Sequence, residues 1–271
     1  MPIYRPTELK KFLSSLSTGP KKHLSQNFLV DGNILRKIVA VAQIQPNETI
    51  LEIGPGPGAL TECLLQASSK VVAVEKDTLL SQSLRRLAPI DQLQIFTEDI
   101  LEFSFEKHLS FPTKVIANLP YHLTAPILGR LVPKTHLFNA IYVMVQEEVA
   151  RRMTAVKGSS DYSSLSVFLQ FYSKPAYCFG VSRKCFYPVP KVDSAVVELT
   201  LKTPPKDIDS EAFLKLVHLA FNQRRKTLRA SLKETYGADV IEKALAILDL
   251  APTTRPEEMT LEDWLKLFQK I

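Results

Sequence analysis

The sequence is short of three things: closely spaced cysteines, long uncharged apolar runs and low-complexity segments. Its cysteines, Cys63, Cys178 and Cys185, are odd in number and too far apart for a zinc site or a CxxC redox pair. We expect buried thiols in a reducing cytosol, and no metal. The amino-terminal MPIYRPTELKKFL lacks the apolar core of a signal peptide, and no apolar run approaches the roughly 18 residues of a membrane span. We therefore expect a cytoplasmic protein.

What the sequence does contain is enough apolar material for a sizeable core, together with an excess of positive charge. With 45% hydrophobic residues over 271 positions, we expect one α/β domain and a smaller second domain. The net charge of +6 suits a polyanionic partner, and the charge is unevenly distributed. Two basic clusters stand out, one in residues 1–26 (Arg5, Lys10, Lys11, Lys21 and Lys22) and one around the acid-free stretch 222–233 (Arg224, Arg225, Lys226, Arg229 and Lys233).

Short β-rich runs alternate with amphipathic helical stretches between Thr49 and Val145, which is typical of βαβ units on a parallel sheet. Strand-like runs at 164–173 and 193–201 follow, and a polar Pro-Pro linker at 202–210 precedes a helical region. We therefore place a first domain with a basic amino-terminal arm at 1–203 and a small all-helical domain at 204–271. The expected strands of the sheet are 49–53, 70–74, 93–97, 114–118 and 139–146, and the expected helices are 32–42, 58–67, 78–88, 124–132, 146–155, 211–221, 224–235, 238–248 and 260–269.

The first expected strand runs into a glycine-rich loop, GPGPGAL at 54–60. Gly54 and Gly56 allow a tight turn and close backbone approach to a ligand, and the next helix points its amino terminus at that ligand. Glu75 ends the second strand, where its carboxylate can accept hydrogen bonds from ribose hydroxyls. The pattern therefore predicts a nucleoside site, although it also matches the dinucleotide fingerprint.

Two features of this site favour S-adenosylmethionine over NAD. Pro55 and Pro57 remove N–H donors that a pyrophosphate would need, whereas S-adenosylmethionine has no phosphate. Asp99, after the third strand, suits the amine of an adenine, although a helix-capping or solvated turn carboxylate is an equally ordinary use of such a residue.

The tetrapeptide Asn118-Leu119-Pro120-Tyr121 ends the fourth strand and bears the predicted chemistry. The lone pair of an adenine N6 amine is delocalised into the ring, so methylation needs acceptors that hold both N–H groups and orient the nitrogen. The side-chain oxygen of Asn118 and the backbone carbonyl of Leu119 can supply them. Tyr121 would stack on the extruded base. A plain turn with a core tyrosine is the alternative, and the position of the turn at the predicted pocket argues against it.

A Pro-interrupted loop, CFYPVPKV at 185–192, offers a second ring for the flipped base. Phe186 is the first candidate and Tyr187 the competing one, while a loop phenylalanine packed under the sheet is the structural alternative. Prolines at 188 and 190 would keep the loop rigid.

The carboxyl-terminal basic cluster lies at the start of an expected helix. Arg225 and Arg229 share one face of a helix, as do Lys226 and Arg229, while Leu228 and Leu232 would face a core. We expect the basic face to hold RNA phosphates rather than to be an ordinary solvated surface. The expected RNA-binding residues are Lys21, Lys22, Arg224, Arg225, Lys226 and Arg229.

Over nearly its whole length the chain resembles the ribosomal RNA small-subunit adenine dimethyltransferases. The resemblance implies an α/β fold, with a Rossmann-like class I methyltransferase domain and a small helical domain. It also implies N6,N6-dimethylation of two adjacent adenines in a hairpin loop near the RNA 3′ end, during late assembly of the small ribosomal subunit, and we expect a monomer. The matching segments are KKHLSQNFLVD (21–31), LEIGPGPGALT (51–61), NLPYH (118–122), YSSLS (162–166), FYPVPKVDSAVV (186–197) and FNQRRKTLRASL (221–232).

Carried over residue by residue, the resemblance implies cofactor contacts and base-stacking residues. It implies stacking by Tyr121 and Phe186. The chain departs from the family at Ser25, where the family usually has glycine; if that position needs a positive φ, serine would strain the loop that carries Asn27 and Leu29. The residues implied to contact S-adenosylmethionine are Asn27, Leu29, Gly54, Glu75, Asp99 and Asn118, and the glycine loop adds Gly56.

Three alternative functions remain at this point. The related methyltransferases that modify large-subunit ribosomal RNA and confer macrolide resistance share the cofactor loop and a similar Asn-x-Pro-Tyr turn. A non-catalytic RNA-binding assembly factor, or a mitochondrial-type transcription factor, could keep the fold without the chemistry, although Glu75, Asp99 and Asn118 argue for activity. An NAD-dependent dehydrogenase would leave the basic clusters without a use.

Overall fold

The computed structural model describes residues 3–68, 70–223 and 226–271, and the chain divides into two compact units. The first unit comprises Met1–Ala150 and Ala176–Leu201, and the second comprises Arg151–Pro175 and Lys202–Ile271. The domain boundary expected at residue 203 lies two residues from the division between Leu201 and Lys202. It does not account for 151–175, which the structure groups with the carboxyl-terminal segment.

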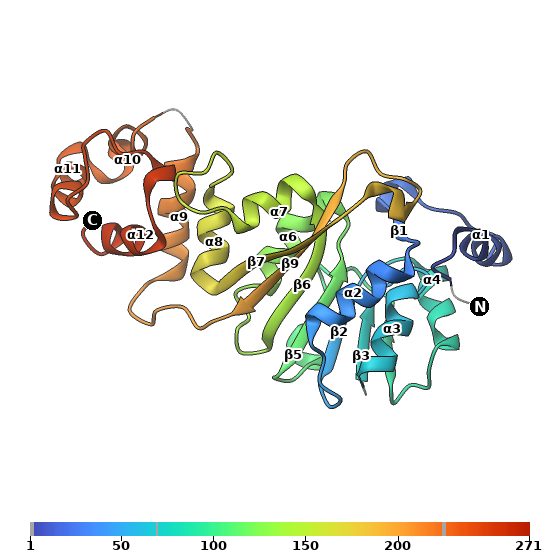
Figure 1. The fold of residues 1–271 in the computed structure, drawn as a ribbon. Coiled ribbons are helices and arrows are strands. Elements are labelled where there is room, and N and C mark those ends of the chain that lie inside the picture. Colours follow the sequence, from blue (N-terminus) through green and yellow to red (C-terminus); the bar gives the residue numbers. More distant parts are fainter. Residues whose placement is uncertain (1–2, 69, 224–225) are drawn as a thin grey trace. The chain divides into compact units, whose positions relative to one another are not determined.

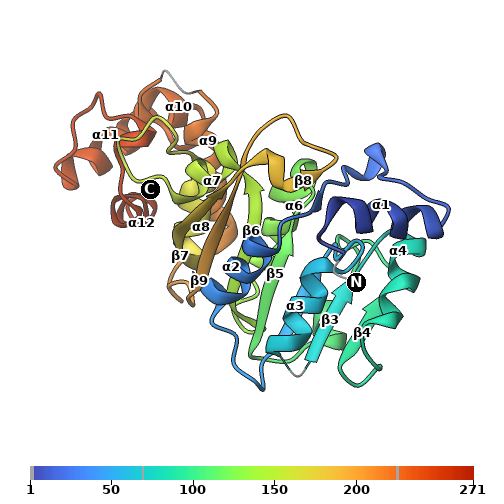
Figure 2. The same ribbon diagram turned by 45° about the vertical axis from the view of Figure 1, so that its right-hand side comes forward.

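The first unit is built on a seven-stranded sheet with the order β4-β3-β2-β5-β6-β9-β7 (Figures 1 and 2). Strands β4, β3, β2, β5 and β6 are parallel to one another, and β9 is antiparallel to β6. The interior residues of β2, β3 and β5 are buried on both faces, as in sheets covered by helices on each side. The strands are β2 (Thr49–Ile53), β3 (Lys70–Val74), β4 (Leu93–Phe96), β5 (Thr113–Asn118), β6 (Phe138–Gln146), β7 (Ser173–Val181) and β9 (Ser194–Leu201).

The register of the parallel strands brings their carboxyl ends to one edge. Ile53 at the end of β2 pairs with Val74 of β3 and with Ala117 of β5, and Val74 pairs with Phe96 of β4. The residues that follow these strands are therefore neighbours, although they are far apart in the sequence. The open edge of such a sheet is where ligands bind in α/β folds.

The helices of the first unit begin where the sequence supplies caps. The Asp31 side chain accepts hydrogen bonds from the amides of Asn33 and Ile34 at the start of α2, as expected, and Asp77 caps α4 in the same way. Helix α1 was not expected: Pro6 opens it, and it buries Leu9 and Leu13. These helices are α1 (Pro6–Ser15), α2 (Gly32–Ala42), α3 (Ala59–Ala67), α4 (Thr78–Ser83), α5 (Phe105–His108) and α6 (Thr124–Leu131), with short 3-10 turns at Lys22–Leu24, Leu84–Arg86, Tyr121–Leu123 and Arg183–Cys185. Helix α7 (Glu147–Thr154) spans the boundary between the two units.

A second, two-stranded sheet joins the amino-terminal segment to the expected loop at 185–192. Strand β1 (Phe28–Leu29) pairs antiparallel with β8 (Phe186–Tyr187). Phe28 lies opposite Tyr187, and Leu29 lies opposite Phe186. The loop is thus tied to the segment that carries the predicted cofactor contacts.

The second unit contains α8 (Ser164–Tyr172), α9 (Ser210–Phe221), α10 (Leu228–Tyr236), α11 (Ala238–Ile247) and α12 (Leu261–Phe268), with a 3-10 turn at Pro256–Glu258. Its core includes Phe171 and Phe213, whose ring centroids are 4.8 Å apart, and the fully buried Trp264. Leu228 and Leu232 of α10 are buried, as the helical spacing predicts.

The strand expected at 164–173 is wrong, because Ser164–Tyr172 is a helix. A short run that is apolar on every side does not distinguish a buried strand from a buried helix by its period. The capping serines decide the outcome: the Ser163 amide donates to Ser166 Oγ at 3.0 Å, and Ser166 Oγ donates to the carbonyl of Arg152 at 2.6 Å. The strand itself begins at Ser173, where the helix ends.

Within the described residues, no helix is long and apolar enough to cross a membrane. The three cysteines are free and only partly buried, so the expectation of buried thiols is met in part. Burial raises the pKa of Cys63, Cys178 and Cys185 above the ordinary thiol value, which favours the unreactive protonated form.

Candidate active site

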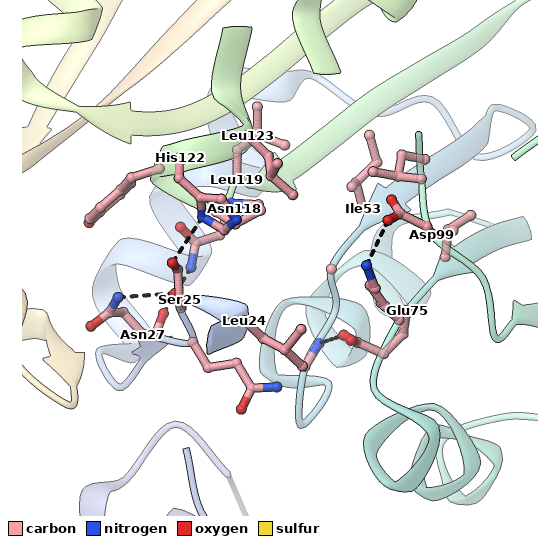
Figure 3. Close-up of a pocket in the computed structure, with 18 of the residues that line it drawn as sticks. Leu24, Ser25, Asn27, Ile53, Glu75, Asp99, Asn118, Leu119, His122 and Leu123 are labelled. Atoms are coloured by element: carbon pink, nitrogen blue, oxygen red, sulfur yellow. Dashed lines mark hydrogen bonds and ion pairs between the residues drawn. The ribbon is translucent and has the colours of Figure 1, made fainter. Parts of the chain in front are cut away.

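A cavity of about 220 Å³ opens at the carboxyl ends of β2, β3, β4 and β5. Four successive loops reach it, because each follows one of these parallel strands: the glycine loop after β2, the Glu75 turn after β3, the Asp99 turn after β4 and the Asn118–Tyr121 turn after β5. A fifth segment, 23–28, comes from the amino-terminal part of the chain and lines the same cavity. Figure 3 shows the side chains of these loops converging on the cavity.

The glycine loop has the backbone that its sequence predicts. Gly54, Gly56 and Gly58 have φ angles of 64°, 57° and 93°, in the left-handed region that glycine adopts readily. A Cβ built on Gly56 would lie 3.0 Å from the ring of Phe28, whereas one built on Gly54 would meet no atom within 4 Å. Gly54 also lines the cavity, so its missing side chain leaves ligand-accessible space.

Glu75 links the glycine loop to the turn after β3. Its carboxylate accepts the amide of Gly56 at 2.9 Å and the amide of Asp77 at 2.8 Å. Burial raises the pKa of Glu75, and the backbone hydrogen bonds oppose that rise. Each carboxylate oxygen keeps a second lone pair, so a ribose contact remains compatible with these bonds.

Asp99 caps a turn and lines the cavity, and its predicted contact with an adenine amine stays a prediction. Its Oδ1 accepts the amide of Leu101 at 2.9 Å, which is a turn-capping bond, and the residue also lines the cavity. Its Oδ2 lies 2.8 Å from Lys76 Nζ, and this hydrogen-bonded ammonium holds the pKa of Asp99 below the ordinary value. We did not predict Lys76, which follows Glu75 directly in the sequence.

Asn118 lies at the end of β5 with its side-chain amide already oriented. Its Nδ2 donates to the backbone carbonyl of Asn27 at 3.2 Å, so Oδ1 is the amide atom left to accept a further N–H group (Figure 3). Leu119 is buried, and its amide donates to the carbonyl of Met144 at 3.1 Å, which ties the turn to β6. Asn118 and Leu119 both line the cavity.

The two predicted stacking rings have different environments. Tyr121 lines the cavity, and its hydroxyl lies 2.7 Å from Ser194 Oγ. Phe186 is 1% exposed, packs in the core through its pairing with Leu29 and is not among the residues that line the cavity. Tyr187 packs beside α1, with Lys10 Nζ 5.0 Å from its ring centroid. A stacking role for Phe186 would therefore require the β1–β8 pair to open, and it stays a prediction.

The segment 21–27 is anchored to Asp77, in the turn after β3. Lys21 Nζ lies 2.9 Å from Asp77 Oδ2, and Gln26 Nε2 donates to the same oxygen at 3.0 Å. Although burial acts in the opposite direction, these hydrogen bonds lower the pKa of Asp77. Asn27 lines the cavity, whereas Leu29 lies behind it, in a small apolar hollow under the glycine loop. The sequence patterns did not predict a role for Gln26, which lies within the segment 21–31, or for Asp77, two residues after Glu75.

The expected RNA-binding residues are not equivalent in the structure. Lys22 and Lys226 are exposed, and Lys21 is engaged by Asp77. Arg229 forms an ion pair with Glu242 of α11, so an acidic side chain from another helix lies beside the expected basic face, and the RNA contact of Arg229 stays a prediction. Helix α10 begins at Leu228, not near 224, because Thr227 caps it. Arg224 and Arg225 lie outside the described residues.

S-adenosylmethionine fits the residues present. The open space at Gly54, the carboxylate of Glu75 and the side chain of Asp99 line one cavity, as a nucleoside with a small polar tail requires. Pro55 and Pro57 leave the loop short of the amide donors that bind pyrophosphate, as the sequence predicts.

Glu52, one residue before the loop, is a buried carboxyl that we did not predict. It is 1% exposed, lines the hollow behind the cavity, and its Oε2 has no hydrogen-bond partner within the described part of the chain. Burial, reinforced by the charge of Glu75, raises the pKa of Glu52 to about 8. Its signal in the sequence is an acid inside an otherwise apolar strand.

Comparisons with known proteins agree on one family. The family model described as "Ribosomal RNA adenine dimethylase" matches residues 19–271. The chain is 56% identical to ribosomal RNA small subunit methyltransferase A of Protochlamydia amoebophila, covering 100% of this chain and 98% of the relative. It is 45% identical to the protein of the same name in Chlamydia felis, covering 97% and 94%.

Solved structures give the same result at lower identity. A dimethyladenosine transferase from Plasmodium falciparum matches with a TM-score of 0.76 and 27% identity, covering 89% of this chain and 95% of that one. The 23S ribosomal RNA methyltransferase ErmE matches with a TM-score of 0.71 and 27% identity, covering 90% and 99%. The fold is therefore the expected Rossmann-like one.

Proposed function

Because this chain belongs to the ribosomal RNA adenine dimethylase family, we propose that it methylates the N6 amines of two adjacent adenosines in small-subunit ribosomal RNA. The methyl donor of this family is S-adenosylmethionine. The hairpin loop near the RNA 3′ end is the proposed target, within an assembling small subunit and with the enzyme acting as a monomer.

The observation that carries this proposal is the oriented amide of Asn118. Its Nδ2 is occupied by the Asn27 carbonyl, so its Oδ1 is available as an acceptor at the edge of the cavity that Glu75 and Asp99 also line. An acceptor beside the nucleoside cavity is what an adenine amine needs, because its N–H groups must be held for its nitrogen to take up a tetrahedral geometry.

Four groups of this chain would then bind the target base and the cofactor. The amide oxygen of Asn118 and the backbone carbonyl of Leu119 accept the two N–H groups of the target amine. Tyr121, fixed by Ser194, offers its ring to the extruded base. Glu75 holds the ribose of the cofactor. S-adenosylmethionine, when bound, supplies an activated methyl group on a sulfonium, so no strong general base is required of the protein.

The small-subunit substrate is favoured over the large-subunit one by similarity. Relatives named for the small subunit are 56% and 45% identical, whereas the large-subunit enzyme ErmE is 27% identical. A non-catalytic factor would not need the Asn118 amide to be oriented toward a cofactor cavity. The basic residues Lys22 and Lys226, with Lys21, Arg224, Arg225 and Arg229 as further candidates, are proposed to contact RNA phosphates.

The test is labelled methyl transfer from S-adenosylmethionine to small subunits that lack these methyl groups, followed by mapping of the modified bases. We expect label on two adjacent adenosines of the small-subunit RNA and none on large-subunit RNA offered in parallel. Label on the large-subunit RNA would support the macrolide-resistance alternative. Cofactor binding without any transfer would support the non-catalytic one.

A further inference from the structure

Ser25 and His122 join two segments that lie 97 residues apart. Ser25 follows the 3-10 turn Lys22–Leu24, and His122 lies in the turn Tyr121–Leu123. The Ser25 Oγ and His122 Nδ1 atoms are 2.9 Å apart, and both residues line the cavity (Figure 3). The bond therefore joins the amino-terminal segment to the turn that follows Asn118, at the wall of the cavity.

The backbone of Ser25 is unusual for a residue with a side chain. Its φ of 52° and ψ of 36° lie in the left-handed region, where glycine is relaxed and serine is not. The expectation that serine at this position would be strained is met. A strained residue persists only where its surroundings hold it, and the hydroxyl bond to His122 is such a restraint, one that glycine could not provide.

The same segment also orients the reactive amide. Asn27 Nδ2 donates to the Ser25 carbonyl at 3.1 Å, and the Asn27 carbonyl in turn accepts Asn118 Nδ2 at 3.2 Å. A continuous chain of contacts thus runs from His122 through Ser25 and Asn27 to Asn118. Lys21 and Gln26 also anchor the segment to Asp77, in the turn after β3.

We propose that the Ser25–His122 hydrogen bond is a latch that closes the segment 21–27 over the bound cofactor and fixes the amide of Asn118. Ser25 and His122 are then positioning residues: they act through Asn27 and do not touch the reacting atoms. The expected loss of methyl transfer rests on the proposed function. The expected change in cofactor release requires only that the cavity binds S-adenosylmethionine. Breaking the latch should speed release and lower turnover together.

Two substitutions at His122 form a matched pair. Asparagine places an amide atom near the position of the imidazole Nδ1, whereas glutamine places one near Nε2, so His122→Asn can keep the bond to Ser25 and His122→Gln cannot. We expect Ser25→Ala and His122→Gln each to raise the cofactor dissociation rate about fivefold, the scale of one lost hydrogen bond. His122→Asn should stay near the wild-type rate, and the Ser25→Ala/His122→Gln double variant should be no faster than either single variant.

Ser25→Gly separates the hydroxyl from the backbone strain. It relieves the left-handed conformation, so its unfolding midpoint should not fall, yet it should release cofactor as fast as Ser25→Ala. The measurements are the release of tritiated S-adenosylmethionine during a chase with unlabelled cofactor, kcat with saturating cofactor, and the unfolding midpoint of each variant.

The latch is refuted if Ser25→Gly releases cofactor at the wild-type rate, or if His122→Asn and His122→Gln behave alike. It is also refuted if the variants change only the unfolding midpoint. Failure of the proposed substrate is distinguishable, because the release assay contains no RNA. A wild-type protein that does not methylate small subunits but still shows the release pattern would keep the latch and discard the substrate.

Discussion

At the scale of single residues, the side-chain amide of Asn118, at the carboxyl end of β5, has the main role in the proposed methyl transfer. Asn118→Ala removes an acceptor that matters most when the amine nitrogen becomes tetrahedral, so kcat should fall by about 100-fold or more. Affinity for S-adenosylmethionine should fall by less than about tenfold, since Glu75 and the glycine loop remain. Single-turnover methyl transfer and calorimetry measure the two effects.

Asn139→Ala is the matched control for that variant. Asn139 lies at the opposite, amino end of β6, where its Nδ2 is 3.5 Å from Glu48 Oε1, and it should keep near wild-type turnover. Near-normal turnover of Asn118→Ala at saturating cofactor would remove Asn118 from the chemical step.

The buried carboxyl of Glu52 should make stability depend on pH. Its pKa is raised from 4.5 to about 8 in the folded chain, so between these values the unfolded state ionises while the folded state keeps the proton. Neutral Glu52 makes its full contribution to the free energy of unfolding below about pH 4.5. This contribution is lost progressively as the pH rises toward 8. The free energy at stake is on the order of a few kcal/mol.

Glu52→Gln removes this titration and keeps the shape of the side chain. Urea unfolding at pH 6 and pH 9 should show a smaller loss of stability at the higher pH in the variant than in the wild type. An unchanged difference between the two pH values would mean that Glu52 is already ionised in the folded protein.

At the scale of elements, two glycines of the loop 54–58 line the cavity but differ in what an added Cβ would meet. Gly54→Ala and Gly56→Ala carry a similar left-handed strain of about 1–2 kcal/mol. The Cβ at position 56 also meets the Phe28 ring at 3.0 Å, whereas the Cβ at position 54 meets no protein atom within 4 Å and stands at the cavity. Gly56→Ala should therefore lose more stability than Gly54→Ala.

The shift in unfolding temperature that S-adenosylmethionine causes is a second measurement on these variants. S-adenosylmethionine should raise the unfolding temperature of Gly54→Ala by less than it raises that of the wild type, because the added methyl group occupies ligand space. A wild-type shift in Gly54→Ala would place the cofactor elsewhere in the cavity.

At the scale of the whole molecule, a net charge of +6 predicts that affinity for RNA falls as salt concentration rises. Lys226→Glu should weaken binding to undermodified small subunits and reduce the slope of log affinity against log salt by about one to two. Lys266→Glu, at an exposed position of α12, makes the same change of two charges and is the control. Equal effects of the two variants would assign binding to net charge rather than to the cluster at 222–233.

The sequence by itself determined the parallel sheet, the glycine loop and the positions of Glu75, Asp99 and Asn118. Each of these depends on a local pattern: strand periodicity, a turn that only glycine relaxes, and the rule that parallel strands end at one edge. The expected strands at 49–53 and 70–74 match β2 and β3 residue for residue.

Only the tertiary structure decided which side chains face one another. The helix at Ser164–Tyr172 depends on the distant carbonyl of Arg152, and the burial of Phe186 depends on its pairing with Leu29. Likewise, Glu242 neutralises Arg229 from another helix, and His122 reaches Ser25 across the cavity. These contacts join residues from different elements, so no local period or spacing encodes them, and packing of the whole chain is what selects them.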